Sequence, residues 1–229
     1  MTVKTILIAG AGGVLGTALA HEFSSAGYTV IGVRRSGVSQ VPNGIFTEMH
    51  SCDLRSQADI KKVVEHIVDE FGAIDVLVYN AAQLVIAPFM ELTPSDFENT
   101  WQTSVGGAFT CAQAVLPNMV SRQQGTMIFS GATASLRGAA RFAALATAKF
   151  GLRGLAQSLA REYQPKGIHV AHVVIDGLLR GSASVARFGG KEENTIDPAA
   201  VASTYRWLAE QPTSAWTLEL DIRPNTERF

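Results

Sequence analysis

A glycine-rich turn near the N-terminus is the first stretch with residues that could do chemistry. Residues 10–16, Gly-Ala-Gly-Gly-Val-Leu-Gly, lie between an apolar run and a segment with apolar residues at helical spacing. Glycines at such a turn let the backbone approach a pyrophosphate, and the free N–H groups at the helix start attract its charge. The alternative is a merely tight strand-to-helix turn. We expect a dinucleotide to be bound here, by Gly10, Gly12, Gly13, Val14 and Gly16.

A pair of arginines bears on which dinucleotide binds. Arg34 and Arg35 end the second apolar run, where an acidic residue would hydrogen-bond the ribose 2′-hydroxyl of NAD. Arginine side chains suit a 2′-phosphate instead. The pair therefore favours NADP over NAD. Two surface arginines without this role are the alternative.

The pattern of apolar residues predicts the elements that position these groups. Short runs typical of strands buried on both faces are found at residues 5–9, 28–33, 45–49, 74–79, 126–129, 168–175 and 216–222. Helices are expected at residues 15–26, 57–71, 95–122, 143–163 and 198–210. This alternation predicts an α/β fold with a doubly wound parallel sheet of the Rossmann type. In such sheets ligands bind beyond the carboxyl ends of the strands.

Size and charge narrow the class of protein. With 229 residues, 47% of them hydrophobic and 17% charged, the chain can bury one core, so residues 1–229 are expected to form a single domain. A net charge of −1 offers no field for nucleic acid or an anionic membrane, and no apolar run approaches the length of a membrane span. The N-terminus shows no signal-peptide pattern. We expect a small-molecule partner and a cytoplasmic location.

Cys52, Cys111 and His172 are expected to be core residues. The spacing of the cysteines matches neither a disulfide framework nor a Cys-x-x-Cys zinc motif, so no metal site is predicted. Free cysteines are usually buried as small hydrophobic groups. His172 falls inside the run at 168–175, which favours a hydrogen-bonded core histidine.

Together these motifs resemble the short-chain dehydrogenase/reductase family over nearly the whole chain. Besides the glycine turn, the resemblance is carried by residues 52–54 (Cys-Asp-Leu), residues 80–82 (Asn-Ala-Ala) and Lys149. The family's loop is G-x-x-x-G-x-G, and Val14 takes the place of its middle glycine. The resemblance implies that Asp53 contacts the adenine ring, that Asn80 steadies the central sheet, and that Lys149 holds the ribose. Asn80 and its neighbour Ala81 are further expected among the cofactor-binding residues.

The catalytic positions that the resemblance implies hold unusual residues. The family has a tyrosine four residues before the lysine, whose hydroxyl exchanges a proton with the substrate, and this chain has Leu145 there. The family's serine falls on Ala132, and its helix asparagine falls on Ser104. An aliphatic side chain cannot donate a proton. Lys149 and Ser104 are the polar groups that remain at these positions.

Arg137 and Asp176 are the candidates to take over the proton transfer. Arg137 follows the strand at 126–129, and Asp176 ends the strand at 168–175, close to where the resemblance places the nicotinamide. A charged pair over an apolar pocket could polarise a carbonyl or an iminium. A structural ion pair or two solvated turn residues are the alternative. Ser130 and Thr133 also flank the altered serine position, but the geometry of the strand end can aim them elsewhere.

Three functions are compatible with this pattern. The first is an NADP(H)-dependent oxidoreductase with a non-standard active site that reduces a small carbonyl or imine-type substrate. The second is a protein that binds NADP but catalyses non-redox chemistry, such as a cyclisation or a Diels–Alder reaction. The third is a non-catalytic cofactor-binding or regulatory protein. The resemblance further implies a short substrate lid at residues 178–196, and a homodimer or homotetramer formed through the outer face of the helix at 143–163.

Overall fold

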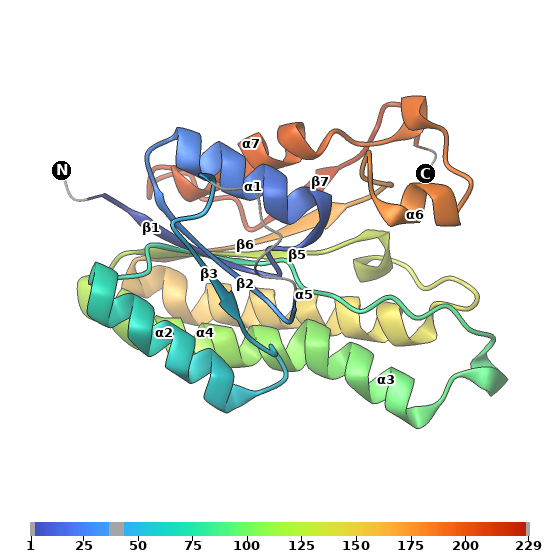
Figure 1. Cartoon of the computed structure of the whole chain (residues 1–229), viewed down its shortest axis with the longest axis horizontal. Helices are drawn as coiled ribbons and strands as arrows, with labels where there is room; N and C mark the ends of the chain where they lie inside the picture. The colour runs from blue at the N-terminus through green and yellow to red at the C-terminus, as the bar shows by residue number, and fades with distance from the viewer. Residues whose placement is uncertain (1–2, 37–43, 228–229) are drawn as a thin grey trace.

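The computed structural model describes residues 3–36 and 44–227, which form one sheet with helices on both faces (Figure 1). The seven strands of the described residues are all parallel and have the order β3-β2-β1-β4-β5-β6-β7. Their bounds are β1 (Thr5–Ala9), β2 (Thr29–Arg34), β3 (Glu48–Ser51), β4 (Val76–Tyr79), β5 (Gly125–Ser130), β6 (Ile168–Ile175) and β7 (Glu219–Ile222). The predicted α/β fold with a doubly wound sheet is confirmed.

Helices cover the sheet in two layers, each with its own core (Figure 1). The helices are α1 (Gly13–Ser25), α2 (Gln57–Phe71), α3 (Pro94–Trp101), α4 (Gly107–Arg122), α5 (Ala143–Tyr163), α6 (Ala183–Arg187) and α7 (Pro198–Ala209). Helices α2, α4 and α5 pack on one face, and α1 and α7 pack on the other. Because both faces are covered, every residue of β1 and β6 is buried, which explains why these strands show no alternation.

The strand order reverses at β1, which pairs with β2 on one side and β4 on the other. The connections that leave the carboxyl ends of β1 and β4 therefore run to opposite sides and leave room between them. The glycine-rich turn follows β1 at this point. The fold thus places the predicted nucleotide-binding residues where open α/β sheets bind ligands.

Three elements differ clearly from the prediction, and one of them, β7, begins at Glu219 instead of Trp216. The third strand begins three residues later than expected, at Glu48, because Phe46 packs over Gly32 in the core on the α1 face and does not pair with β2. The helix expected at 95–122 is divided into α3 and α4 by a π-helical turn, Gln102–Gly106. Tyr79 donates a hydrogen bond to the Thr103 carbonyl in this turn, which ties it to the end of β4. Such π turns are frequent at functional sites.

Candidate functional site

Glycine is required by geometry at several positions of the turn after β1. Gly10 has a φ of +91°, and a Cβ there would lie 2.6 Å from the backbone nitrogen of Ala81. Gly13 has a φ of +71° and begins α1. A Cβ on Gly16 would lie 2.6 Å from the carbonyl oxygen of Ala11. The turn therefore packs directly against Ala81, after β4.

The start of α1 is suited to bind an anion. Its N-cap, Gly12, has no side chain to accept from the first-turn N–H groups, and that turn contains no acidic residue. The positive end of the helix dipole and these N–H groups are therefore available to a phosphate. Asn80 supports the turn, because its Nδ2 donates to the Gly10 carbonyl over 3.1 Å and its backbone N–H donates to that of Ala9 over 2.8 Å.

A cavity of about 630 Å³ opens beside this turn at the carboxyl edge of the sheet. Its lining includes most of the predicted cofactor residues, namely Gly10, Gly12, Arg34, Arg35, Asp53, Asn80 and Ala81. Gly13 and Val14 line a neighbouring hollow together with Arg180. A groove of about 740 Å³ between α2 and α4 contains none of the predicted residues. The nucleotide cavity thus gathers groups from the ends of β1, β2, β3 and β4.

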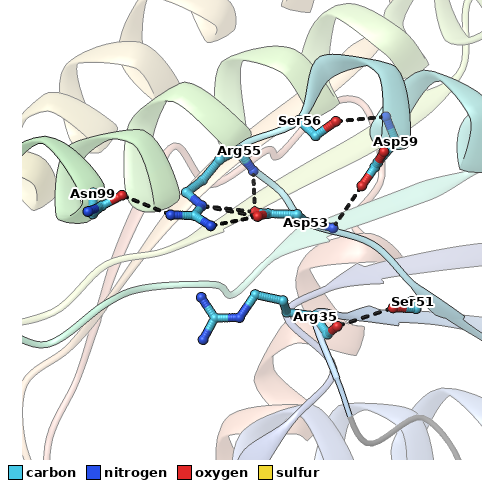
Figure 2. Close-up of polar contacts among 7 residues, drawn as sticks. All are labelled: Arg35, Ser51, Asp53, Arg55, Ser56, Asp59 and Asn99. Atoms are coloured by element: carbon cyan, nitrogen blue, oxygen red, sulfur yellow. Dashed lines mark hydrogen bonds and ion pairs between the residues drawn. The ribbon is translucent and has the colours of Figure 1, made fainter.

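The two arginines at the end of β2, Arg34 and Arg35, both border this cavity. Arg34 Nε donates to the Ser36 carbonyl over 2.6 Å, and a Cβ on Gly12 would lie 3.9 Å from the same nitrogen. Arg35 is positioned through its backbone, since its carbonyl accepts from Ser51 Oγ over 3.1 Å. Its guanidinium makes no ion pair with the described residues, and Figure 2 shows it extended on the same side as Asp53. Two cationic groups are therefore available at the end of β2.

Asp53 is held by an arginine that the sequence did not point to. Arg55 donates from Nε to Oδ1 over 3.0 Å and from Nη2 to Oδ2 over 2.7 Å (Figure 2). Its Nη1 donates to Asn99 Oδ1 over 2.8 Å. The hydrogen bond from Arg55 is the largest cause that lowers the pKa of Asp53 to about 2. Ser56, not Asp53, caps α2. Arg55 also lines the cavity. Its position two residues after Asp53 was the feature of the sequence that could have suggested this contact.

Lys149 lies inside the protein and not on a solvated helix face. It is 4% exposed, and its Nζ donates to the Ser130 carbonyl at the end of β5 over 2.6 Å. Burial lowers its pKa to about 8. The Ser130 hydroxyl is engaged with Tyr205 Oη at 2.8 Å, so it is directed toward α7. Of these two groups, only the lysine is on the α5 side of the strand end.

Ser104 occupies the π-helical turn and is fully buried. Its Oγ has no hydrogen-bond partner among the described residues. A buried hydroxyl without a partner costs about 1–3 kcal/mol and commonly marks a contact with water or a ligand. Leu145 and Ala132 are both half-buried, on α5 and just after β5. The four positions named by the resemblance therefore combine a cation, one hydroxyl and two aliphatic groups.

Arg137 and Asp176 are brought together, but Asp176 has closer partners. The Asp176 carboxylate, 4% exposed, accepts from the Thr133 hydroxyl and lies 3.4 Å from Arg223 Nη2. Arg137 Nη2 is 4.0 Å away, and this side chain is 52% exposed. Thr133 and Asp176 line a pocket of about 590 Å³ that also includes Gly177 and residues of the 178–196 segment. Thr133 is therefore aimed at this pocket, and Arg223 is a partner that sequence reasoning missed.

The 178–196 segment lies over both halves of the site. The ring of Phe188 stacks on that of Phe142 at the start of α5, with centroids 6.0 Å apart. A Cβ on Gly181 would lie 3.5 Å from Val14 Cγ1 in the glycine turn. The segment therefore reaches from the glycine turn to the helix that contains Lys149.

The predicted core residues are confirmed. His172 is 1% exposed, its Nδ1 lies 3.1 Å from Glu219 Oε2, and burial lowers its pKa to about 4. Cys52 and Cys111 are free, buried thiols, and burial raises the pKa of Cys52 to about 11. Within residues 3–36 and 44–227, no helix has the length and apolar character needed to cross a bilayer.

This site defines a Rossmann-type nucleotide-binding protein, and comparison with known proteins identifies its family. The family model of short chain dehydrogenases matches residues 4–182. A short-chain dehydrogenase of known structure from Rhodopseudomonas palustris is 35% identical, with a TM-score of 0.83 over 96% of this chain and 98% of that one. The chain belongs to the short-chain dehydrogenase/reductase family of oxidoreductases.

Two further proteins illustrate its more distant similarities. An NADPH-dependent pterin aldehyde reductase from Arabidopsis thaliana is 28% identical over 169 residues, which cover 71% of this chain and 70% of that protein. A metagenomic short-chain oxidoreductase in complex with NADP is 24% identical, with a TM-score of 0.85 over 98% of each chain. The similarity to the metagenomic oxidoreductase shows a shared fold.

Proposed function

We propose that the protein is an NADP(H)-dependent oxidoreductase with a non-standard active site, which reduces a small carbonyl or imine-type substrate. The observation that carries this proposal is the buried amine of Lys149, held 2.6 Å from the Ser130 carbonyl. Burial opposes the ionisation of a lysine, so a buried lysine lowers the stability of the folded protein. A lysine retained in such a place, one helical turn after Leu145, supports a role in holding the ribose next to the reacting carbon.

The cofactor of this reaction is NADP, which supplies a hydride when bound. The chain fits it in three ways. The glycine turn leaves space for the pyrophosphate at the start of α1, and Arg34 and Arg35 offer two cations for the 2′-phosphate. The unpartnered hydroxyl of Ser104 is a polar atom still to be satisfied, which suits a bound ligand or its water.

Leu145 and Ala132 occupy, in this proposal, the places of the family's tyrosine and serine. Reduction of a carbonyl needs one hydride and one proton, whereas reduction of an iminium needs the hydride alone. A cationic substrate therefore removes the need for the missing hydroxyl. The buried carboxylate of Asp176 and the Thr133 hydroxyl line the adjacent pocket, where they could orient such a substrate. For a carbonyl, Arg137, Asp176 or water would supply the proton.

The remaining parts of the proposal concern access and assembly. Residues 178–196 act as a short substrate lid, supported by their contacts with α5 and with the glycine turn. Phe150, on the outer face of α5, is 44% exposed, and Trp101 at the end of α3 is 40% exposed. Large exposed apolar side chains at neighbouring helices favour a homodimer or homotetramer formed through this face.

Deuteride transfer tests the proposed reaction. NADPH labelled with deuterium at the nicotinamide C4 is incubated with the protein and a panel of small aldehydes, ketones and cyclic imines. We expect deuterium in the product, with imines favoured over carbonyls. Saturable NADPH binding with no transfer to any substrate would instead favour the non-redox or regulatory alternatives.

A double variant tests the assignment of the altered positions. Leu145→Tyr with Ala132→Ser is expected to gain carbonyl reductase activity of at least tenfold over the parent, because the new phenol lies one turn before Lys149. The matched control is Thr147→Tyr with Ala132→Ser, since Thr147 is exposed on the same helix. Equal activity in both double variants would contradict the assignment.

A further inference from the structure

A second cluster of ligand-type side chains lies at the edge of the sheet, outside the nucleotide cavity. Glu48 and His50 are two residues apart on β3, so both side chains leave the strand on the same face, where they meet His66 of α2. His50 Nε2 lies 2.7 Å and His66 Nε2 lies 2.9 Å from the same carboxylate oxygen, Glu48 Oε2. The two imidazole rings are 5.1 Å apart between centroids.

The spacing of these ligand atoms is close to that of a metal site. One atom from each of the three side chains lies within 4.8 Å of the other two. A tetrahedral zinc ion with bonds of about 2.0–2.1 Å holds its ligand atoms about 3.3 Å apart. The two His–Glu contacts are shorter than this by only about half an ångström. Because the side chains of His50, His66 and Glu48 are 26%, 46% and 30% exposed, they can open slightly and admit water as a fourth ligand.

The charges of the cluster also suit a cation. One carboxylate oxygen accepts from two imidazoles, which requires both rings to carry a proton on Nε2. An anionic oxygen on which two imidazole nitrogens converge is a donor set that divalent transition metals prefer.

We propose that Glu48, His50 and His66 bind one divalent transition-metal ion of the zinc type, with a water molecule as the fourth ligand. The ion takes the place of the two Nε2 protons between the imidazoles and the carboxylate, and each displaced proton moves to Nδ1 of its ring or to solvent. It ties the four-residue strand β3 to α2, and so stabilises a strand that, among residues 3–36 and 44–227, has a partner strand on one side only. The proposal departs from the expectation of no metal site, because its ligands come from two elements and include no cysteine.

Zinc titration of the purified, tag-free chain tests this site. We expect one Zn²⁺ per chain by calorimetry and a rise in Tm on adding ZnCl₂. His66→Ala and His50→Gln are each expected to weaken binding at least tenfold and to abolish the Tm rise. His21→Ala is the matched control, because His21 is exposed on α1, outside the cluster, and its loss should change neither readout.

Cobalt supplies a readout of ligand identity. Co²⁺ bound at the proposed site should show d–d absorption without a thiolate charge-transfer band, since the thiols of Cys52 and Cys111 are buried elsewhere. The proposal is overturned by a lack of saturable Zn²⁺ binding, by binding that persists in His66→Ala, or by a thiolate band. An equal loss in His21→Ala would likewise overturn it. Folding of each variant is checked by its circular dichroism without metal.

Discussion

The nucleotide side and the reaction side of the site differ in what they demand of the sequence. On the nucleotide side, Gly10 and Gly16 leave no space for a Cβ, and backbone groups and arginine charges surround the cavity. On the proposed reaction side, Leu145 and Ala132 are half-buried aliphatic residues, and the buried Lys149 lies one helical turn after Leu145. A dinucleotide is held mainly by backbone and charge, whereas proton transfer depends on a single hydroxyl. Dinucleotide binding can therefore persist when the hydroxyl for proton transfer is replaced.

The largest expected effect is on the nucleotide side, at Gly10. Gly10→Ala places a methyl group 2.6 Å from the backbone nitrogen of Ala81, at a φ of +91°, so the turn must move. We expect NADPH affinity to fall more than 100-fold, measured by NADPH fluorescence. Gly154→Ala is the control, because a Cβ there meets nothing within 4 Å and lies in α5. This control should bind normally and gain roughly 0.5–1 kcal/mol in stability.

Removing Lys149 tests the reaction side through pH. In the folded protein its pKa is about 8, against an ordinary value of 10.5. Between these values the unfolded chain keeps a proton that the folded chain has released, so the free energy of unfolding rises with pH. The rise is about 3 kcal/mol at most. Lys149→Met should lack it and should bind NADPH more weakly.

Urea unfolding at pH 7 and pH 10 measures this difference. Lys61→Met is the control, because Lys61 is exposed on α2 and its loss should leave the pH dependence unchanged. If Lys149→Met has the same pH dependence of stability as the parent, burial does not lower the pKa of the Lys149 amine.

Replacing Arg35 is expected to have an intermediate effect, on the preference for NADPH over NADH. Arg35→Ala removes a guanidinium that has no ion-pair partner among the described residues but borders the cavity. We expect NADPH affinity to fall about tenfold, which corresponds to about 1.4 kcal/mol, while NADH affinity stays unchanged. Arg161→Ala, an exposed arginine on α5, is the control. If binding of NADPH and NADH weakens equally, Arg35 does not bind the 2′-phosphate.

The smallest expected effect is at Arg55. Arg55→Ala removes the hydrogen bonds that lower the pKa of Asp53 to about 2, so this pKa should rise toward 3.8. In the parent, the depressed pKa contributes stability above pH 3.8 that is lost as the pH falls toward 2, and the variant should lack this contribution. Carbon-13 NMR of the carboxyl group measures the titration. NADPH affinity should fall a few-fold, and an unchanged Asp53 pKa would contradict the role given to Arg55.

The sequence by itself determined the fold, the layers and the position of the candidate nucleotide site. Helices at residues 57–71 and 143–163 and the strand at 168–175 have the predicted bounds, because local periodicity and end signals specify them. The glycine turn was predictable for the same reason, since its residues are consecutive and follow a buried strand. Site residues close in sequence to such a signal could be placed without coordinates.

Tertiary structure alone decided which polar groups meet. Arg55 reaches Asn99 across 44 positions, and Thr133 reaches Asp176 across 43. The π-helical turn at Gln102–Gly106 depends on the approach of the helix to Tyr79 on β4, which no local pattern encodes. The physical reason is that a side chain's partners are set by how the sheet and helices pack, whereas its local conformation is set by its neighbours in the chain.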